Sequence, residues 1–187
     1  MTPRSQAMAE PELLLLRHGI AEEPAEHQND ADRALTATGR RRTLAVLERA
    51  AALGLGVERL MASPLLRARQ TGELAVAAGL APSLELATAL APGGDPLPLL
   101  STWLQAASVD GAPPALLSLA LVGHEPDLSD LAALLLAAPA GSLRLRKAGM
   151  ALLQWTPAAA EPQPDAPSAA AGSWQLLLLL APRILLG

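Results

Sequence analysis

The sequence contains no cysteine, no phenylalanine and no tyrosine among its 187 residues, and only three tryptophans. The absence of cysteine excludes disulfides, thiolate metal ligands and cysteine nucleophiles. Because 51% of the residues are nonetheless hydrophobic, the core must consist of Leu, Ala and Val side chains with little aromatic packing. A chain of this length buries enough surface to fold as one domain without crosslinks.

Long hydrophobic runs and concentrated positive charge are absent as well. The run 176–181 has six residues, whereas a membrane-spanning helix needs about 18 or more. The net charge is −4, and no basic stripe is visible, which argues against a nucleic-acid partner. The first apolar run follows Glu10 and Glu12 and is too short for a signal peptide. The sequence therefore predicts a cytoplasmic protein with neither membrane nor nucleic-acid partners.

Short apolar runs alternate with amphipathic segments, a pattern typical of α/β proteins. Strands are expected at residues 13–16, 57–62, 83–86, 115–122, 149–155 and 173–180, and helices at 37–53, after Pro64, at 97–107 and at 127–137. Thr36 and Ser63 are expected to cap the first two helices. The alternation predicts a mostly parallel sheet with helices on both faces, a three-layer α/β/α sandwich whose last two strands pair antiparallel at an edge.

The N-terminal residues and one internal segment differ in composition from the rest of the chain. Residues 1–11 lack periodicity and are expected to form a disordered tail before a single domain at 12–187. Residues 157–172 are rich in Pro and Ala and are expected to form a disordered or variable hairpin loop.

Three of the expected strands end in polar residues. Arg17 and His18 follow four consecutive leucines, Ser63 precedes Arg67 after the second strand, and His124 follows the fourth strand. Parallel strands place these exits at one rim of the sheet, where ligands of α/β proteins bind. Arginine forks bind phosphate oxygens, and a helix N-terminus adds positive potential. The pattern therefore predicts an anion site.

A metal site is the first alternative. His18 and His124, with one of Glu22, Glu23 or Glu125, have the composition of a site with two histidines and one carboxylate. Adjacent arginines would repel the metal cation, so we expect no metal and no cofactor.

Other polar residues are better explained as loop or surface residues than as parts of a site. His27 lies in a polar loop without patterned neighbours, and Arg69 fits a solvated helix position. Arg144, Arg146 and Lys147 have the pattern of a surface cluster preceding a strand.

Five motifs occur in a fixed order over roughly residues 12 to 155. They are Leu16-Arg17-His18-Gly19, Arg33-Ala34-Leu35-Thr36 with Gly39, Ser63-Pro64-Leu65-Leu66-Arg67-Ala68-Arg69-Gln70-Thr71, Pro92-Gly93-Gly94-Asp95 and Val122-Gly123-His124-Glu125-Pro126. In this set the chain resembles the histidine phosphatase superfamily, most closely its small SixA-type branch of phosphohistidine phosphatases. The resemblance implies a phosphoglycerate mutase-like fold and a covalent phosphohistidine intermediate.

The resemblance also implies roles for individual residues. It makes His18 the nucleophile, Arg17 and Arg67 the phosphate clamp, and His124 a second imidazole, expected to be protonated, that stabilises the transferring group. Arg33 is implied near the phosphate pocket. Gly19 and Ser63 are further expected substrate contacts.

The proton donor is where the chain departs from the wider superfamily. Many members carry a Glu or Asp before the fourth of these motifs, but residues 87–91 contain no carboxylate. Glu22, Glu23 and Asp95 remain candidate donors.

The expected function is removal of phosphoryl groups from phosphohistidine in proteins, with a phosphorylated His-containing phosphotransfer protein as the expected partner. A small-metabolite phosphomonoesterase is the alternative, weakened by the missing carboxylate and by a chain too short for a large cap domain. A phosphate-binding module without turnover is a third, less favoured because the four proposed catalytic residues Arg17, His18, Arg67 and His124 are all present.

Overall fold

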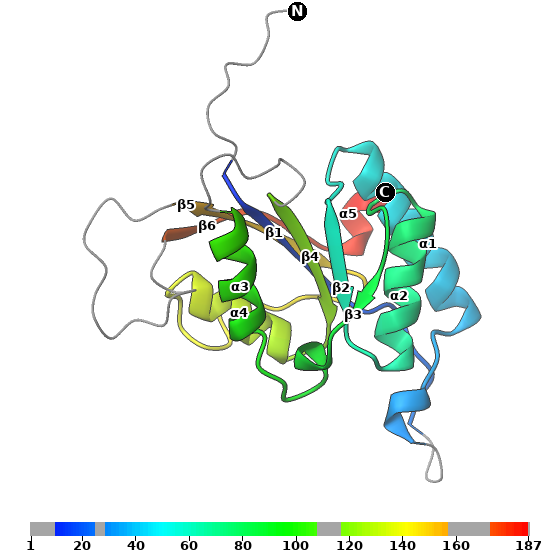
Figure 1. The fold of residues 1–187 in the computed structure, drawn as a ribbon. Coiled ribbons are helices and arrows are strands. Elements are labelled where there is room, and N and C mark those ends of the chain that lie inside the picture. The colour runs from blue at the N-terminus through cyan, green and yellow to red at the C-terminus, as the bar shows by residue number, and fades with distance from the viewer. Residues whose placement is uncertain (1–9, 25–28, 108–116, 157–172, 187) are drawn as a thin grey trace, which may run out of the picture.

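The computed structural model describes residues 10–24, 29–107, 117–156 and 173–186 (Figure 1). Its strands are β1 (Glu12–Arg17), β2 (Arg59–Ala62), β3 (Glu85–Leu86), β4 (Ser118–Gly123), β5 (Met150–Thr156) and β6 (Ser173–Leu180). Its helices are α1 (Ala37–Ala52), α2 (Leu66–Ala77), α3 (Leu97–Ala107), α4 (Asp127–Leu135) and α5 (Pro182–Leu186), with the 3-10 turns η1 (Asp30–Asp32) and η2 (Thr88–Leu90).

The strands form one six-stranded sheet in the order β3-β2-β4-β1-β5-β6. The first four strands are parallel to their neighbours, whereas β5 runs antiparallel to β1, and β6 runs antiparallel to β5 at the edge. At the carboxyl ends of the central strands, Arg17 pairs with Gly123, and Ala62 pairs with Val122. The register therefore brings the exits of β1, β2 and β4 side by side, as the sequence predicts.

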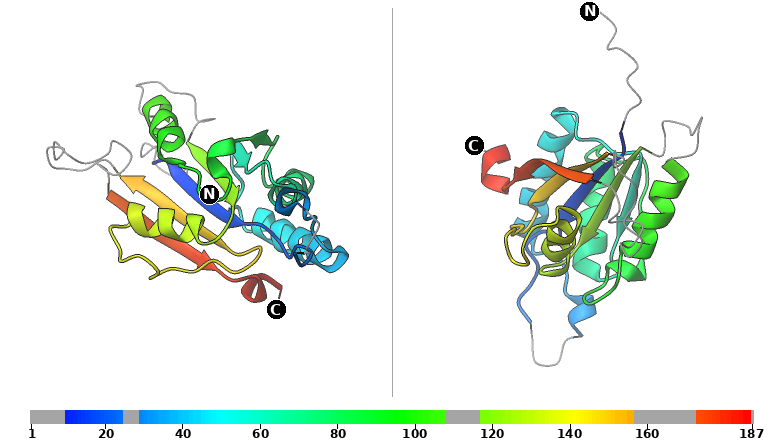
Figure 2. Two further views of the ribbon diagram at one scale, coloured as in Figure 1. Left: turned by 90° about the horizontal axis from the view of Figure 1, so that it is seen from below. Right: turned by 90° about the vertical axis from the view of Figure 1, so that its left-hand side faces the viewer.

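The four leucines of β1 supply both faces of the sheet. Leu13 and Leu15 are fully buried in a core that includes Trp103 of α3 and apolar residues of α4. Leu14 and Leu16 enter a second core against α1 and α2. The two helix pairs lie on opposite sides of the sheet in Figure 2, which confirms the three-layer α/β/α sandwich. A strand covered on both faces has no solvent-facing position, so its sequence does not alternate.

Helix α1 begins and ends where the sequence predicts. The side chain of Thr36 accepts a hydrogen bond from the Gly39 backbone N–H at 2.9 Å, satisfying one free donor of the first turn. A Cβ atom at Gly39 would lie 2.0 Å from the carbonyl oxygen of Ile20, so only glycine permits this approach. Gly54, with φ of +82°, terminates the helix. These contacts fix the first turn of α1 against the segment that follows His18.

The predicted cap of α2 is wrong. The helix begins at Leu66 after Leu65, which makes no side-chain cap. The Ser63 backbone N–H instead donates to the Val122 carbonyl at 3.0 Å and continues the ladder between β2 and β4. The Ser63 hydroxyl accepts the Leu65 backbone N–H at 3.3 Å, before the helix begins, and lies 2.8 Å from Nε2 of His124.

Several predicted segments fall wholly or partly outside the described residues. These are residues 1–9 of the expected tail, the first part of the strand expected at 115–122 and the expected loop 157–172. Pro11, also assigned to the tail, is buried, and its carbonyl accepts a hydrogen bond from the Trp155 backbone N–H at 2.8 Å. This contact attaches Pro11 to the sheet.

Helix α5 was not predicted, and it packs against α1. Its signal is Pro182 at the first helical position, where proline is favoured. Among the residues described, no helix combines the length and the apolar character needed to cross a membrane.

Candidate active site

The exits of β1, β2 and β4 bring two imidazoles together. The ring centroids of His18 and His124 lie 5.2 Å apart, and Nε2 of His124 contacts the Ser63 hydroxyl. Both rings are buried, as is Arg67 in the first turn of α2, whose side chain is only 5% exposed. The structure therefore assembles the predicted rim.

One hydrogen bond fixes the tautomer of His18. Its Nδ1 lies 2.7 Å from the carbonyl oxygen of Gly19, which can only accept, so Nδ1 carries the proton and Nε2 holds the lone pair. The Gly19 backbone N–H donates to the Thr71 hydroxyl at 3.1 Å. A Cβ atom at Gly19 would lie 2.2 Å from Oγ1 of Thr43. Gly19 therefore positions His18, and its N–H is already occupied.

Both histidines are neutral at neutral pH. The pKa of His18 is lowered to about 3, mainly by burial. The hydrogen bond to Gly19 opposes this shift, and the charges of His124, Arg67 and Arg17 add to it. Burial also lowers the pKa of His124 to about 4, with Arg67 contributing and Asp30 opposing. Without bound substrate, burial and the nearby guanidinium groups therefore disfavour a proton on His124. The expected protonation of His124 during phosphoryl transfer stays a prediction.

Arg17 is held by a chain of hydrogen bonds that runs through Leu145 and Ser129 to Glu125. Its Nη1 donates to the Leu145 carbonyl at 2.8 Å, and the Leu145 N–H donates to the Ser129 hydroxyl at 3.2 Å. That hydroxyl lies 2.7 and 2.8 Å from the two carboxylate oxygens of Glu125. Glu125 is thus engaged with Ser129 and, through this chain, supports Arg17.

Asp30 joins the two other arginines of the site. Arg67 donates through Nη1 to the Asp30 carbonyl at 2.7 Å and through Nη2 to its carboxylate at 2.9 Å. Arg33 donates through Nε to the second carboxylate oxygen at 2.7 Å, and through Nη1 to the carbonyl of Glu22 at 2.9 Å. The structure therefore places Arg33 beside Arg67, and it adds Asp30, which the sequence reasoning missed.

The Asp30 carboxylate is ionised. Partial burial raises its pKa, but its hydrogen bonds and charge interactions with Arg67 and Arg33 outweigh this and leave the pKa below its usual value. A carboxylate of this kind orients guanidinium groups well and is a poor proton donor at neutral pH.

Three buried polar atoms of the site lack hydrogen-bond partners among the described residues: Nε of Arg17, Nε of Arg67 and Nδ1 of His124. Buried polar groups in native proteins are nearly always paired. Two of these atoms are guanidinium N–H donors, and the charges of both arginines act on both imidazoles. The arrangement suits an oxyanion held between the arginines and the histidine pair.

The three predicted proton donors, Glu22, Glu23 and Asp95, are exposed. The carboxylate of Asp95 accepts the Leu97 backbone N–H at 3.0 Å at the start of α3. None of the three is hydrogen-bonded to His18 or His124 within the described residues. In the same part of the chain, no three His, Asp or Glu side chains lie close enough to hold a metal ion.

Comparison with known proteins agrees with this geometry. The family model described as "Histidine phosphatase superfamily (branch 1)" matches residues 13–90, which include Arg17, His18 and Arg67. An uncharacterized protein from Picosynechococcus sp. is 44% identical over 140 residues, which cover 74% of this chain and 82% of the relative.

Solved structures of the same fold extend the likeness over nearly the whole chain. The structure of the protein histidine phosphatase SixA complexed with tungstate matches with a TM-score of 0.70 and 25% identity, covering 93% of this chain and 99% of that chain. A mycobacterial glucosyl-3-phosphoglycerate phosphatase matches with a TM-score of 0.66 and 18% identity, covering 89% and 96%. The chain therefore belongs to the histidine phosphatase superfamily.

Proposed function

We propose that the protein hydrolyses phosphohistidine in proteins through a phosphohistidine intermediate on His18. The observation that carries this proposal is the neutral, Nδ1-protonated state of His18, which leaves the lone pair on Nε2. That state follows from burial, which lowers the pKa to about 3, and from the hydrogen bond to Gly19. A neutral imidazole held in one tautomer is a competent nucleophile at neutral pH.

The reaction has two steps. In the first, Nε2 of His18 attacks phosphorus, the new N–P bond forms, and the P–N bond to the substrate imidazole breaks. In the second, water attacks the phosphorylated His18, the N–P bond breaks, and inorganic phosphate leaves as His18 recovers its lone pair. Splitting the transfer in this way replaces one difficult displacement with two easier ones.

The remaining groups of the site stabilise charge. Arg17 and Arg67 offer guanidinium N–H donors to the equatorial oxygens of the transferring group, which is where phosphoryl transfer most needs stabilisation. His124 stands 5.2 Å from His18, centroid to centroid, and its Nδ1 has no partner among the described residues. Because a bound dianion raises the pKa of a nearby imidazole, His124 gains a proton more readily once phosphate is present.

Among the described residues, no acid is hydrogen-bonded to His18 or His124, and this favours a phosphoramidate substrate. An alkyl phosphate expels an alkoxide unless a donor protonates it, and such a donor contributes about 10²- to 10⁴-fold. The imidazole of phosphohistidine takes a proton from solvent before cleavage and leaves as a neutral ring. Glu22, Glu23 and Asp95 lie outside the described hydrogen bonds of the histidines, and the low pKa of Asp30 opposes a donor role. The similarity to SixA supports the same substrate class.

The experiment is a rapid-quench labelling with a phosphohistidine peptide labelled in its phosphoryl group. We expect a protein-bound label that is acid-labile and alkali-stable, as a phosphoramidate should be, and its complete loss in His18→Ala. His27→Ala removes a different imidazole and serves as the matched control. Label on a carboxylate, or an active His18→Ala variant, would contradict the mechanism.

A substrate panel tests the choice of substrate. We expect kcat/KM to be high for phosphohistidine peptides and aryl phosphates and low for 3-phosphoglycerate. Neutralising Glu22, Glu23 or Asp95 singly should lower phosphohistidine turnover less than about tenfold, short of a general acid's contribution. Comparable rates on all three substrates would instead favour a metabolite phosphatase, the activity in the name of the mycobacterial structure of this fold.

A further inference from the structure

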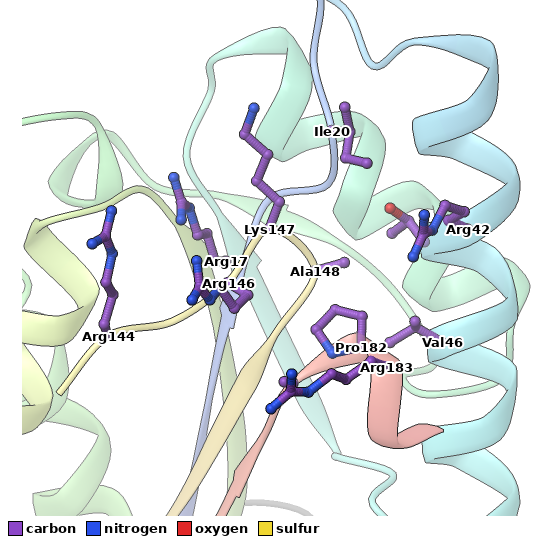
Figure 3. A pocket seen from close by; sticks show the side chains of 12 residues that line it. Arg17, Ile20, Arg42, Val46, Arg144, Arg146, Lys147, Ala148, Pro182 and Arg183 are labelled. Atoms are coloured by element: carbon purple, nitrogen blue, oxygen red, sulfur yellow. The ribbon is translucent and has the colours of Figure 1, made fainter. Parts of the chain in front are cut away.

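A large cationic cavity opens beside Arg17. It has a volume of about 580 Å³, and no acidic residue is among the described residues that line it. Figure 3 shows its lining, with basic side chains on several sides of the opening. Those basic residues are Arg17, Arg42, Arg144, Arg146, Lys147 and Arg183.

The concentration of positive charge does not follow from composition. The chain has a net charge of −4, yet six of its 14 arginine and lysine residues line this one cavity. They come from the end of β1, from α1, from the segment before β5 and from α5, which are far apart in the sequence. None of the six forms a salt bridge within the described part of the chain. Like charges without counter-charges repel one another, so the cluster destabilises the folded state. A bound anion would offset this repulsion.

The cavity and the candidate active site share Arg17. Nη1 of Arg17 donates to the Leu145 carbonyl at 2.8 Å. The Ala148 N–H lies 3.1 Å from the carbonyl oxygens of both Arg17 and His18. The segment carrying Arg144, Arg146 and Lys147 is therefore hydrogen-bonded to the strand end that bears the proposed nucleophile. The sequence suggested only a surface cluster, because the partners from α1 and α5 are invisible there.

The five basic side chains other than Arg17 are not held by hydrogen bonds within the described residues. Within the described residues, the side chains of Arg42, Arg144, Arg146, Lys147 and Arg183 form no hydrogen bond, and all five are exposed. A small-molecule site usually presents a few polar groups fixed by their own contacts. Long, unpaired side chains around a broad opening are better suited to the carboxylates of a protein surface, where charge complementarity sets partner choice and association rate.

We infer that this cavity binds acidic side chains that flank the phosphohistidine on the substrate protein, an inference that rests on the proposed function. The phosphoryl group would lie between Arg17, Arg67 and the histidines, while neighbouring aspartate or glutamate residues enter the cavity. Arg17 would contact both. The site would thereby select phosphoproteins with an acidic surface around the modified histidine.

The test compares two phosphohistidine peptides, one flanked by Asp and Glu and one by Ser and Gln. The variants are Arg146→Glu and Lys147→Glu, and the matched control is Arg49→Glu, which changes the net charge equally at an exposed position of α1 outside the cavity lining. We expect wild type to prefer the acidic peptide by about tenfold or more in kcat/KM at low salt. Both cavity variants should lose this preference, and the control should keep it. Equal kcat/KM for the two peptides in wild type would overturn the inference.

Two further arms separate this inference from the proposed function. If no phosphohistidine peptide is hydrolysed, the proposed function fails. The inference about the cavity is then tested by measuring whether the unphosphorylated acidic peptide inhibits aryl phosphate hydrolysis. Inhibition of wild type and of Arg49→Glu, weakened in Arg146→Glu, supports the cavity as an acidic-segment site, and no inhibition overturns it. Pyrophosphate is the second probe. Strong inhibition by pyrophosphate that depends on Arg146, with no effect of acidic peptides, would make the cavity a small-polyanion site and overturn the inference.

Discussion

Lowering the pH from 7 to 5 should destabilise the protein through its two buried histidines. Well above pH 6.5 both rings are neutral in the folded and the unfolded chain, so they make no difference to stability. Below pH 6.5 the unfolded chain takes up protons on these imidazoles. The folded chain does not, because burial holds the pKa of His18 at about 3 and that of His124 at about 4. The unfolded state binds more protons, so the free energy of unfolding falls as the pH falls.

The size of the effect follows from the two pKa values. At pH 5 an unfolded imidazole with a pKa of 6.5 is about 97% protonated, while each folded imidazole is nearly all neutral. Each histidine therefore lowers the free energy of unfolding by about 2 kcal/mol between pH 7 and pH 5, and the pair by about 4 kcal/mol. That is a large part of the roughly 5–15 kcal/mol that stabilises a typical domain. The loss should level off near pH 4 to 3, where the folded imidazoles themselves gain protons.

The assay is urea denaturation of wild type, His18→Asn, His124→Asn and the control His27→Asn at pH 7, 6 and 5. We expect each of the first two substitutions to remove about half of the pH dependence, about 2 kcal/mol, because asparagine does not titrate. His27→Asn should retain all of it. Identical pH dependence in wild type and in both buried-site variants would refute the reasoning, since it would mean that neither imidazole is held neutral by the fold.

Replacing Arg67 by Lys should lower kcat/KM for an aryl phosphate by about 30- to 1000-fold, because an ammonium cannot reproduce the planar fork that now contacts Asp30, and a lost charge-assisted contact costs about 2–4 kcal/mol in the transition state. The exposed Arg69→Lys is the control, and equal activities would place Arg67 outside the anion site. Gly19→Ala should lower the free energy of unfolding by about 1–3 kcal/mol through overpacking against Thr43, whose Oγ1 would lie 2.2 Å from the new Cβ. Urea denaturation measures this, and Gly19→Ala combined with Thr43→Ala should recover most of the loss; no recovery would mean that the clash is not the cause.

Local sequence was sufficient to predict the buried central strands and the common rim at their ends. Four leucines without alternation require cover on both faces, and Leu13 to Leu16 alternate between two cores as that argument demands. The abrupt change from apolar to polar at His18 and His124 marks strand ends, and parallel strands must bring those ends to one rim. The sequence therefore determined which residues would meet, because a change of polarity is a property of neighbours along the chain.

Where a side chain had two available partners, the sequence could not decide between them. Ser63 next to Pro64 has the pattern of a helix cap, but α2 begins only at Leu66, and the Ser63 hydroxyl contacts His124 as well as the Leu65 N–H. Asp30 is one of several acids in a polar segment. Nothing in the sequence around Asp30 shows that its carboxylate contacts both Arg33 and Arg67. Arg67 lies 37 positions from Asp30.

Only the tertiary structure decided the protonation of the histidines and the cationic cavity. The pKa of His18 depends on how completely strands and helices from the whole chain exclude water from its ring. The cavity brings Arg42 of α1 and Arg183 of α5 to the segment at 144–148, and Arg17 reaches Leu145 across 128 positions. Burial and long-range charge interactions depend on residues from the whole folded chain, so a local sequence pattern cannot predict them. The change from apolar to polar residues at a strand end involves only neighbours in the sequence, so it can be recognised there.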